Sequence, residues 1–341
     1  MGKIIRSVLK CILYAALPLA AIFISLFIGR YNVSFNDVVC TLCGFFSGKT
    51  AADVNVTAEC WSVVTQLRLP RLAAAAVVGA ALAASGGAYQ GIFRNPLVSP
   101  GILGVSAGAG FGAALAIITV GAGMATYGMA FAGGIAAVLL SYWIAGVYKS
   151  APTVMLVLGG TVVQSVFNAL ISLMKYTADA DSELPAIVYW LMGSLSSVSW
   201  KTLPAAIPAV AGIIIMLCCG WRINVLAMGD REARTLGVDV KKTKFVIIAG
   251  ATLATASAVC MSGVVGWVGL IIPHISRMIV GHDARKMLPL SVSAGAVFMV
   301  IIDTVSRSAT ASELPLSILT SLIGAPFFVF LLKKTKGGGW S

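Results

Sequence analysis

Charge is the scarcest property of this 341-residue sequence. Only 11% of its residues are charged, 24 of them basic and 12 acidic, whereas 59% are hydrophobic. A soluble domain carries about a quarter of its residues as charges, so a soluble single-core protein is excluded. The basic excess forms no stripe with interleaved aromatic side chains, which argues against nucleic-acid binding. The composition predicts a polytopic membrane protein.

Histidine and cysteine are too sparse for most site chemistry. The 2 histidines, His274 and His282, make a poor metal site on their own. Of the 7 cysteines, Cys40 and Cys43 share a CxxC spacing and Cys60 follows in the same loop. A disulfide there is one interpretation, and small apolar side chains near lipid are the other. We predict no metal site and no catalytic residue in this chain.

A nucleotide-binding loop is also missing. Residues 48–50, Gly-Lys-Thr, end like a phosphate-binding loop, but Cys43 stands where that loop requires glycine. The GxSxG match at 104–108 lies in a Gly/Ala-rich apolar run, not between a strand and a helix. An intramembrane enzyme built on Ser106 and His274 is therefore a distant alternative. We expect no cofactor on this chain and no ATP site of its own.

Long apolar runs dominate what is present. Ten of them are predicted membrane-spanning helices, of which 267–281 is short. The first follows Lys3, Arg6 and Lys10 and exceeds the usual length of a signal-peptide core, so we expect it to stay uncleaved. Residues 1–341 are thus predicted to form one all-α transmembrane domain, with a short surface helix around 38–46. The ten runs lie at about 11–29, 70–92, 98–119, 124–147, 153–175, 200–219, 243–262, 267–281, 287–306 and 316–332.

The distribution of basic residues predicts the orientation. An even number of spans places both termini on one side. When that side also holds the loop at 222–244, it receives most of the 24 Lys and Arg. Because basic loops stay in the cytoplasm, both termini are predicted to be cytoplasmic in a cell membrane.

Small residues and prolines shape the predicted bundle. Gly, Ala and Ser are abundant in the spans and let helix backbones approach closely in lipid. Pro96 and Pro100 interrupt one half of the chain, and Pro273 matches them in the other. Paired interruptions predict inverted halves with a pathway between them. Asp303 and Arg307, one helical turn apart, are placed to pair with each other.

The segment 222–244 is a charged island between apolar runs. Ionised side chains are costly in hydrocarbon, so this island must lie in water. Within it, Asp230 to Leu236 predicts a short helix with acids near its start and Gly237 at its end. A charged helix fixed between two spans could bind a soluble partner and transmit its motion to the spans.

Four segments together resemble a known family. They are Arg68-Leu-Pro-Arg71, the Gly-rich run at 79–110, the island segment 229–237, and SGVVGWVGLIIPHISRMIVGHDARKMLP at 262–289. In this order and spacing they are similar to the permease subunit of ABC importers for ferric siderophores, haem and vitamin B12, the FecCD type. The resemblance runs from about residue 60 to the C-terminus. Trp267 stands where phenylalanine is usual, and the cysteine-containing loop at 40–60 is not a family hallmark.

The resemblance implies a ten-helix fold with inverted repeat halves and a homodimer with the pathway on its two-fold axis. It also implies two separate ABC ATPase subunits, which bind ATP and Mg, and an extracytoplasmic substrate-binding protein. The permease itself would be non-catalytic. The site residues implied are Gly229, Asp230, Ala233, Leu236 and Gly237 for ATPase coupling, Arg68, Arg71 and Arg307 for binding-protein docking, and Asn95, Pro96, Thr153 and Pro273 for the pathway or gate.

The cargo is the least determined feature. The resemblance implies a metal chelate, with a ferric siderophore or haem first and a corrinoid such as vitamin B12 second, although oxyanion importers share the motifs. An ion-coupled secondary transporter is the alternative, and it would need an acid inside the membrane. Asp303 is the single candidate well inside a span. Dependence of uptake on ATP rather than on an ion gradient separates the two classes.

Overall fold

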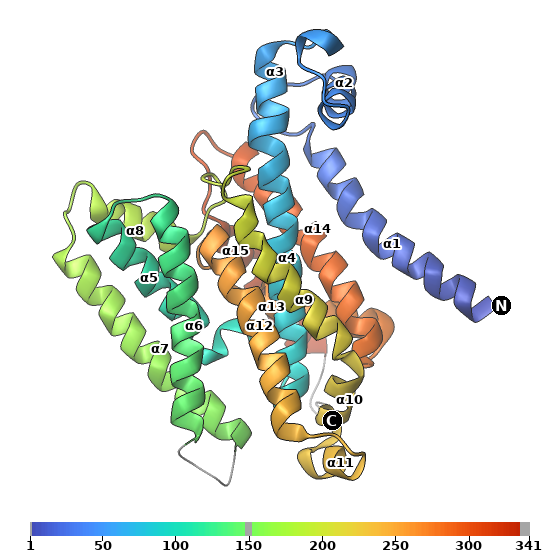
Figure 1. Ribbon diagram of the computed structural model, residues 1–341, viewed down its shortest axis with the longest axis vertical. Helices are drawn as coiled ribbons and strands as arrows, with labels where there is room; N and C mark the ends of the chain where they lie inside the picture. The colour runs from blue at the N-terminus through green and yellow to red at the C-terminus, as the bar shows by residue number, and fades with distance from the viewer. Residues whose placement is uncertain (1, 147–151, 335–341) are drawn as a thin grey trace.

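The computed structural model describes the backbone of residues 2–146 and 152–334, and within these ranges the chain is helical with no strand (Figure 1). Its α-helices are α1 (Gly2–Ser25), α2 (Phe35–Phe46), α3 (Ala58–Ser62), α4 (Leu69–Phe93), α5 (Val105–Thr119), α6 (Met124–Gly146), α7 (Pro152–Thr177), α8 (Glu183–Met192), α9 (Ile207–Cys218), α10 (Gly220–Met228), α11 (Asp230–Thr235), α12 (Val240–Ser262), α13 (Val268–Val280), α14 (Ala284–Ser308) and α15 (Leu316–Lys334). Three short 3-10 helices, η1 (Ala52–Val54), η3 (Pro100–Leu103) and η4 (Leu203–Ala206), lie between them, and the π-helical stretch η2 (Val63–Arg68) joins α3 to α4.

Each of the ten predicted runs contains a helix, and the predicted surface helix is α2. Among the described residues, five helices are long and apolar enough to cross a membrane, and α9 with α10 makes a sixth across a 58° bend. Helices α5 and α13 are shorter, with 15 and 13 residues. Each follows an irregular segment that takes up part of the depth of the bundle. Irregular backbone is tolerated at that depth only where protein surrounds it.

The interruption before α13 lies earlier than Pro273, contrary to the prediction. Helix α13 runs through Pro273, and the irregular backbone falls at Gly263–Trp267. Proline lacks the N–H that would bond the carbonyl of Gly269 four residues back. The side-chain amide of Gln90 donates to that carbonyl at 3.3 Å instead and also to the carbonyl of Val98. The freed acceptor is thereby satisfied, and the helix continues. The inverted relation of the two halves stays a prediction.

Helix α4 forms the centre of the bundle. It continues from α3 as one 36-residue helix, Ala58–Phe93, whose apolar window is 83% buried. A Cβ on Gly79 would overlap the carbonyl oxygen of Gly295 on α14, and a Cβ on Gly86 would overlap that of Gly269 on α13. Glycine therefore allows backbone-to-backbone contact with both neighbours.

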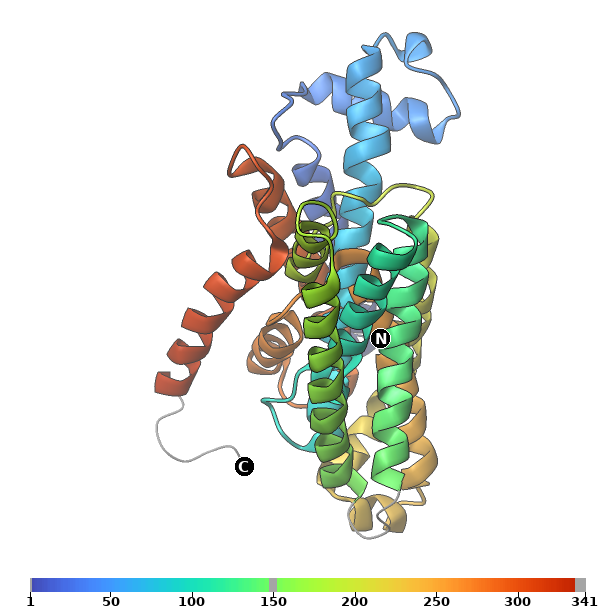
Figure 2. The same ribbon diagram turned by 90° about the vertical axis from the view of Figure 1, so that its left-hand side faces the viewer.

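The two ends of the bundle carry different elements. Helices α2 and α3 lie at one end and α11 lies at the other (Figure 1). Helix α1 leans away from the body toward its N-terminus, and α15 stands off from it on another side (Figure 2). The end with α2 and α3 is called the α2 end below, and the opposite end is called the α11 end.

Candidate functional site

The middle of the charged island folds as predicted, as a short helix at the α11 end, whereas the first residues of the island belong to α10 and the last to α12. Helix α11 begins at Asp230, directly after Gly229, and stops before Gly237, whose φ of 75° suits glycine. Ala233 is fully buried, whereas Leu236 is 54% exposed. The helix therefore has one face against the bundle and an apolar side chain open to a partner.

One ion pair fixes α11 to α12, and a side-chain cap fixes the start of α12 itself. The Asp230 carboxylate accepts a 2.8 Å hydrogen bond from the Lys244 ammonium, which lies on α12 and is only 5% exposed. Asp239 caps α12 by accepting from the backbone N–H of Lys242 at 3.0 Å, and this bond lowers the pKa of that carboxyl below its usual value. A push on α11 is thus transmitted to a helix that is largely buried in the bundle.

The three predicted docking arginines lie together at the α2 end. Arg68 donates to the carbonyls of Leu26 and Tyr31. Together with Arg307, Arg68 and Arg71 line a cavity of about 290 Å³. All three are less than 10% exposed, so they are engaged by the chain itself and not presented freely at a surface.

Two acids hold this cluster. Arg71 donates Nε to Asp303 at 2.8 Å and both terminal nitrogens to Glu313 at 2.8 and 3.0 Å. Arg307 lies 3.7 Å from the same Asp303, which confirms the predicted pair. Glu313 and the contact between Arg71 and Asp303 were not predicted. A buried acid in a membrane span implies a counter-ion. Which residue serves as that counter-ion can be read only from the three-dimensional structure.

The predicted gate residues do not all meet. Asn95 and Pro96 line a cavity of about 430 Å³ at the α11 end, together with His274. Pro273 precedes His274 and is buried in α13. Thr153 lies in the first turn of α7, where its side chain is outside the described residues.

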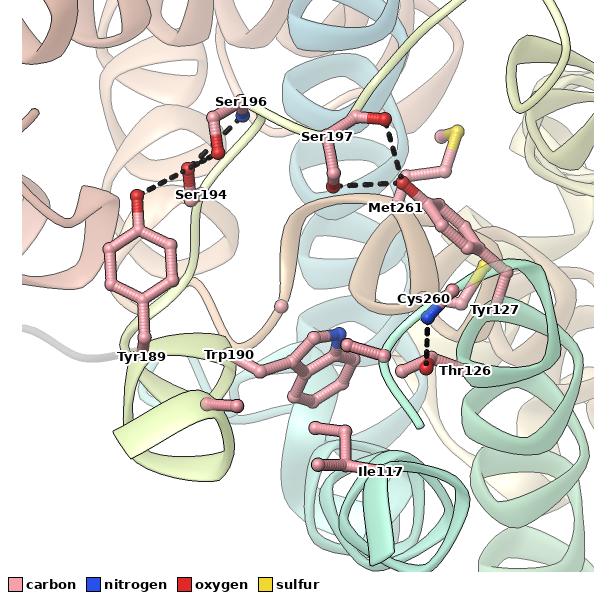
Figure 3. Close-up of a pocket in the computed structure, with 14 residues that line it drawn as sticks. Ile117, Thr126, Tyr127, Tyr189, Trp190, Ser194, Ser196, Ser197, Cys260 and Met261 are labelled. Carbon is pink, nitrogen blue, oxygen red and sulfur yellow. Dashed lines mark hydrogen bonds between the residues drawn. The ribbon is translucent and has the colours of Figure 1, made fainter. Parts of the chain in front are cut away.

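A third cavity, of about 290 Å³, has an uncharged lining that was not predicted (Figure 3). The Tyr127 hydroxyl lies 2.9 Å from the hydroxyl of Ser197, and Tyr189 donates to Ser194 at 3.1 Å. Trp190 supplies an apolar wall between these two groups (Figure 3). Among the described residues that line this cavity there is no histidine or carboxylate, so they offer hydroxyls and apolar surface but no general base.

Metal and nucleophile arrangements are also missing from the part of the chain that is described. No group of three His, Cys, Asp or Glu is found there that could hold a metal ion. Cys40, Cys43 and Cys60 are free thiols. His274 lines the cavity at the α11 end, and Ser106, its proposed partner in an intramembrane enzyme, is not among the described residues that line that cavity.

The chain is similar to a known transport family and to several of its permeases. The FecCD transport family matches residues 17–334. The molybdate import permease MolB of Haemophilus influenzae is 40% identical over 320 residues, covering 93% of each chain. The cobalamin import permease BtuC of Halobacterium salinarum is 44% identical over 277 residues, covering 80% of this chain and 73% of the relative. The hemin transport permease HmuU of Yersinia pestis is 34% identical over 298 residues, covering 85% and 89%.

A solved metal-chelate type ABC transporter in an inward-facing conformation superimposes with a TM-score of 0.83. It is 38% identical and covers 95% of this chain and 99% of its own. These relatives give no support to the ion-coupled alternative. The apolar helices, the island helix α11 and the family match over nearly the whole chain lead to one conclusion: the chain belongs to the FecCD transport family and is a multi-pass membrane permease of an ABC importer for metal-chelate, haem, vitamin B12 or molybdate-type substrates.

Proposed function

We propose that two copies of this chain form the membrane part of an ATP-driven importer, with α11 on each copy seated in a separate ATPase subunit. The observation that carries the proposal is α11 itself, a charged helix that has a fixed contact to α12 and is followed directly by the exposed Leu236. The α11 end and both termini then face the cytoplasm, and the α2 end receives the binding protein. Uptake in proteoliposomes that needs ATP inside and persists without an ion gradient tests this function.

The pathway is proposed to run along α7, where the two copies face each other. The exposed side of α7 is divided into two stripes. One carries apolar side chains (Leu158, Val162, Val166 and Leu173), and the adjacent one, called the polar stripe, carries Thr161, Gln164, Ser165, Asn168 and Ser172. The hydroxyls of the polar stripe bond their own backbone. The amides of Gln164 and Asn168 make no such bond among the described residues, so they need water or another chain.

We predict that a cysteine at Asn168 will react with a water-soluble maleimide in the assembled transporter, whereas a cysteine at Val162 will not. The two positions lie on the same helix but on different stripes, so Val162→Cys is the matched control. Both are made in a background whose 7 native cysteines are replaced by serine. Labelling is measured by mass shift after quenching. Equal labelling of both positions would show that the polar stripe does not line a water-filled path.

Docking is proposed to proceed by exchange of carboxylates at Arg71. Its guanidinium fork is already occupied by Glu313, whose side chain is 29% exposed. An acidic side chain of the binding protein would replace Glu313, while the buried Asp303 keeps its bond to Nε. Bidentate pairing of arginine with a carboxylate makes such an exchange specific.

We predict that Glu313→Gln will raise the affinity for the binding protein several-fold, because the competing internal carboxylate is removed. Arg71→Gln should lower that affinity by about tenfold, since charge-assisted hydrogen bonds contribute about 1.5–3 kcal/mol. Glu59→Gln is the control, because it removes an exposed acid on α3 outside the cluster. Binding is measured by interferometry at two salt concentrations. Weaker binding by Glu313→Gln would contradict the exchange.

We further propose a metal chelate as cargo, with a ferric siderophore or haem first and a corrinoid second. Uncharged surfaces on the polar stripe and in the hydroxyl-lined cavity of Figure 3 support a bulky cargo that is handled without fixed charges. The test is co-purification of the binding protein, followed by uptake of labelled ferric siderophore, haem, cobalamin and molybdate. Uptake of molybdate alone would reject the chelate.

A further inference from the structure

The cavity at the α11 end is lined by positive charge without a matching acid. Its walls come from the end of α4, from α10, from α13 and from the start of α14, and its volume is about 430 Å³. The polar side chains of the lining include Arg94, Asn224, Arg277 and His282. No aspartate or glutamate is among the described residues that line it. An unbalanced cationic cavity of this kind favours an anionic occupant.

Arg277 is the central charge of this cavity, and the chain holds it in place through Gln90. The Gln90 carbonyl oxygen accepts from Nη2 of Arg277. The Gln90 amide nitrogen is committed to the carbonyls of Val98 and Gly269, so its oxygen must face the guanidinium. Gln90 is only 4% exposed, which makes it a rigid support.

The remaining donors of Arg277 have no acid to bind within the described ranges. A guanidinium carries five N–H donors, and one of the two terminal nitrogens bonds Gln90. Asp283 is the neighbouring acid, but Arg285 donates to both of its oxygens at 3.0 Å and Asn224 donates to one at 2.6 Å. Asp283 is thereby neutralised within its own loop. A half-buried guanidinium without a counter-ion is costly, so an external anion would stabilise it.

We propose that this cavity binds a phosphate-type oxyanion, supplied either by the headgroup of an anionic phospholipid or by a free inorganic anion. Arg277 is its main ligand, because a planar guanidinium matches two oxygens of a phosphate. Arg94 lies at the mouth, exposed and held at the end of α4 with a φ of 50°. The volume is ample, since one water takes up about 30 Å³ in the liquid.

The position of the site gives the anion a structural effect. Helix α10 forms one wall and leads directly into α11, while α4 and α13 carry Gln90 and Arg277 on the other side. An oxyanion held by Arg277 and Arg94 would therefore connect the end of α4 to α13 beside α10.

The experiment measures binding of inorganic phosphate to the full-length permease in phosphatidylcholine nanodiscs, by calorimetry and by the shift in unfolding temperature. We expect saturable binding that weakens about tenfold or more in Arg277→Gln and less in Arg94→Gln. Lys286→Gln is the matched control, since it removes one exposed positive charge on α14 outside the cavity. Arg277→Lys keeps the positive charge but loses the planar guanidinium, so it should bind phosphate with an affinity between those of the native protein and Arg277→Gln. It also serves as a second variant in case Arg277→Gln does not fold.

The source of the anion is decided in the same preparation. Adding phosphatidylglycerol to the nanodiscs lowers the apparent phosphate affinity if a lipid headgroup occupies the site, and leaves it unchanged if a free anion does. Absence of phosphate binding to the native permease, or equal binding by native protein and Arg277→Gln, overturns the proposal. Binding that disappears when the ATPase subunit is added also overturns it, because a carboxylate of the partner would then be the counter-ion.

Discussion

Leucine at position 79 should prevent the bundle from assembling. Gly79 on α4 touches the backbone of Gly295 on α14, and even a single Cβ would overlap the Gly295 carbonyl oxygen. Backbone cannot move aside as a flexible side chain can, so the two helices must separate along much of their contact. We expect a loss of about 3 kcal/mol or more, the upper range for overpacking a well-packed core.

The measurement is size-exclusion chromatography of the extracted protein, followed by its unfolding temperature. Gly79→Leu should elute as aggregate or be absent from the membrane, and Gly79→Ala should be folded but less stable. Gly128→Leu is the control, because Gly128 lies on α6 in a similar apolar helix and a Cβ there meets nothing within 4 Å. A Gly79→Leu protein that elutes and melts like the native one would disprove the close approach of α4 and α14.

Reversing the charge of Asp230 is the second substitution with a large expected effect. In Asp230→Lys, two ammonium groups would face each other where a 2.8 Å ion pair now stands, and one of them, Lys244, is only 5% exposed. Like charges at that distance repel strongly when water is excluded. We expect α11 to detach from α12 and ATP-driven uptake to fall at least about tenfold, while ATP hydrolysis by the partner continues.

The swap Asp230→Lys with Lys244→Asp separates two explanations. It restores the ion pair in reverse, so uptake should recover in large part if Asp230 acts by fixing α11 to α12. Uptake that stays low in the swap would mean that the Asp230 carboxylate is needed by the ATPase itself. Uptake at the native rate in Asp230→Lys alone would remove α11 from the coupling role.

The sequence was sufficient for features that depend on local patterns. Helix α11 could be predicted because charge cannot enter hydrocarbon and because Gly237 ends a helix. The ten apolar runs could be recognised because charged residues are absent from hydrocarbon and therefore mark the ends of the runs. Helix α8 was missed, since its ten residues are too few to span a membrane. The bend between α9 and α10 falls at Cys219, directly before Gly220, and we did not take this single glycine as the sign of a bend.

Features that depend on distant contacts were beyond reach. Pro273 was expected to interrupt its helix, but Gln90, far away in the chain, supplies the missing hydrogen bond to Gly269. Arg71 and Glu313 are 242 positions apart, and a single sequence gives no sign that they meet. The roles of the arginines in docking and of Asn95, Pro96, Thr153 and Pro273 in gating stay predictions.

The hydrogen bonds of Gln90 also constrain how the protein can move. One amide joins the end of α4, the irregular segment at Val98 and the first turns of α13, and it also carries Arg277. These parts must travel as one rigid body, since parting them would leave several polar groups unsatisfied in the interior. Among its described residues, helix α7 makes no side-chain hydrogen bond to another helix. The hinge of any opening motion is therefore expected between α7 and the rest of the bundle.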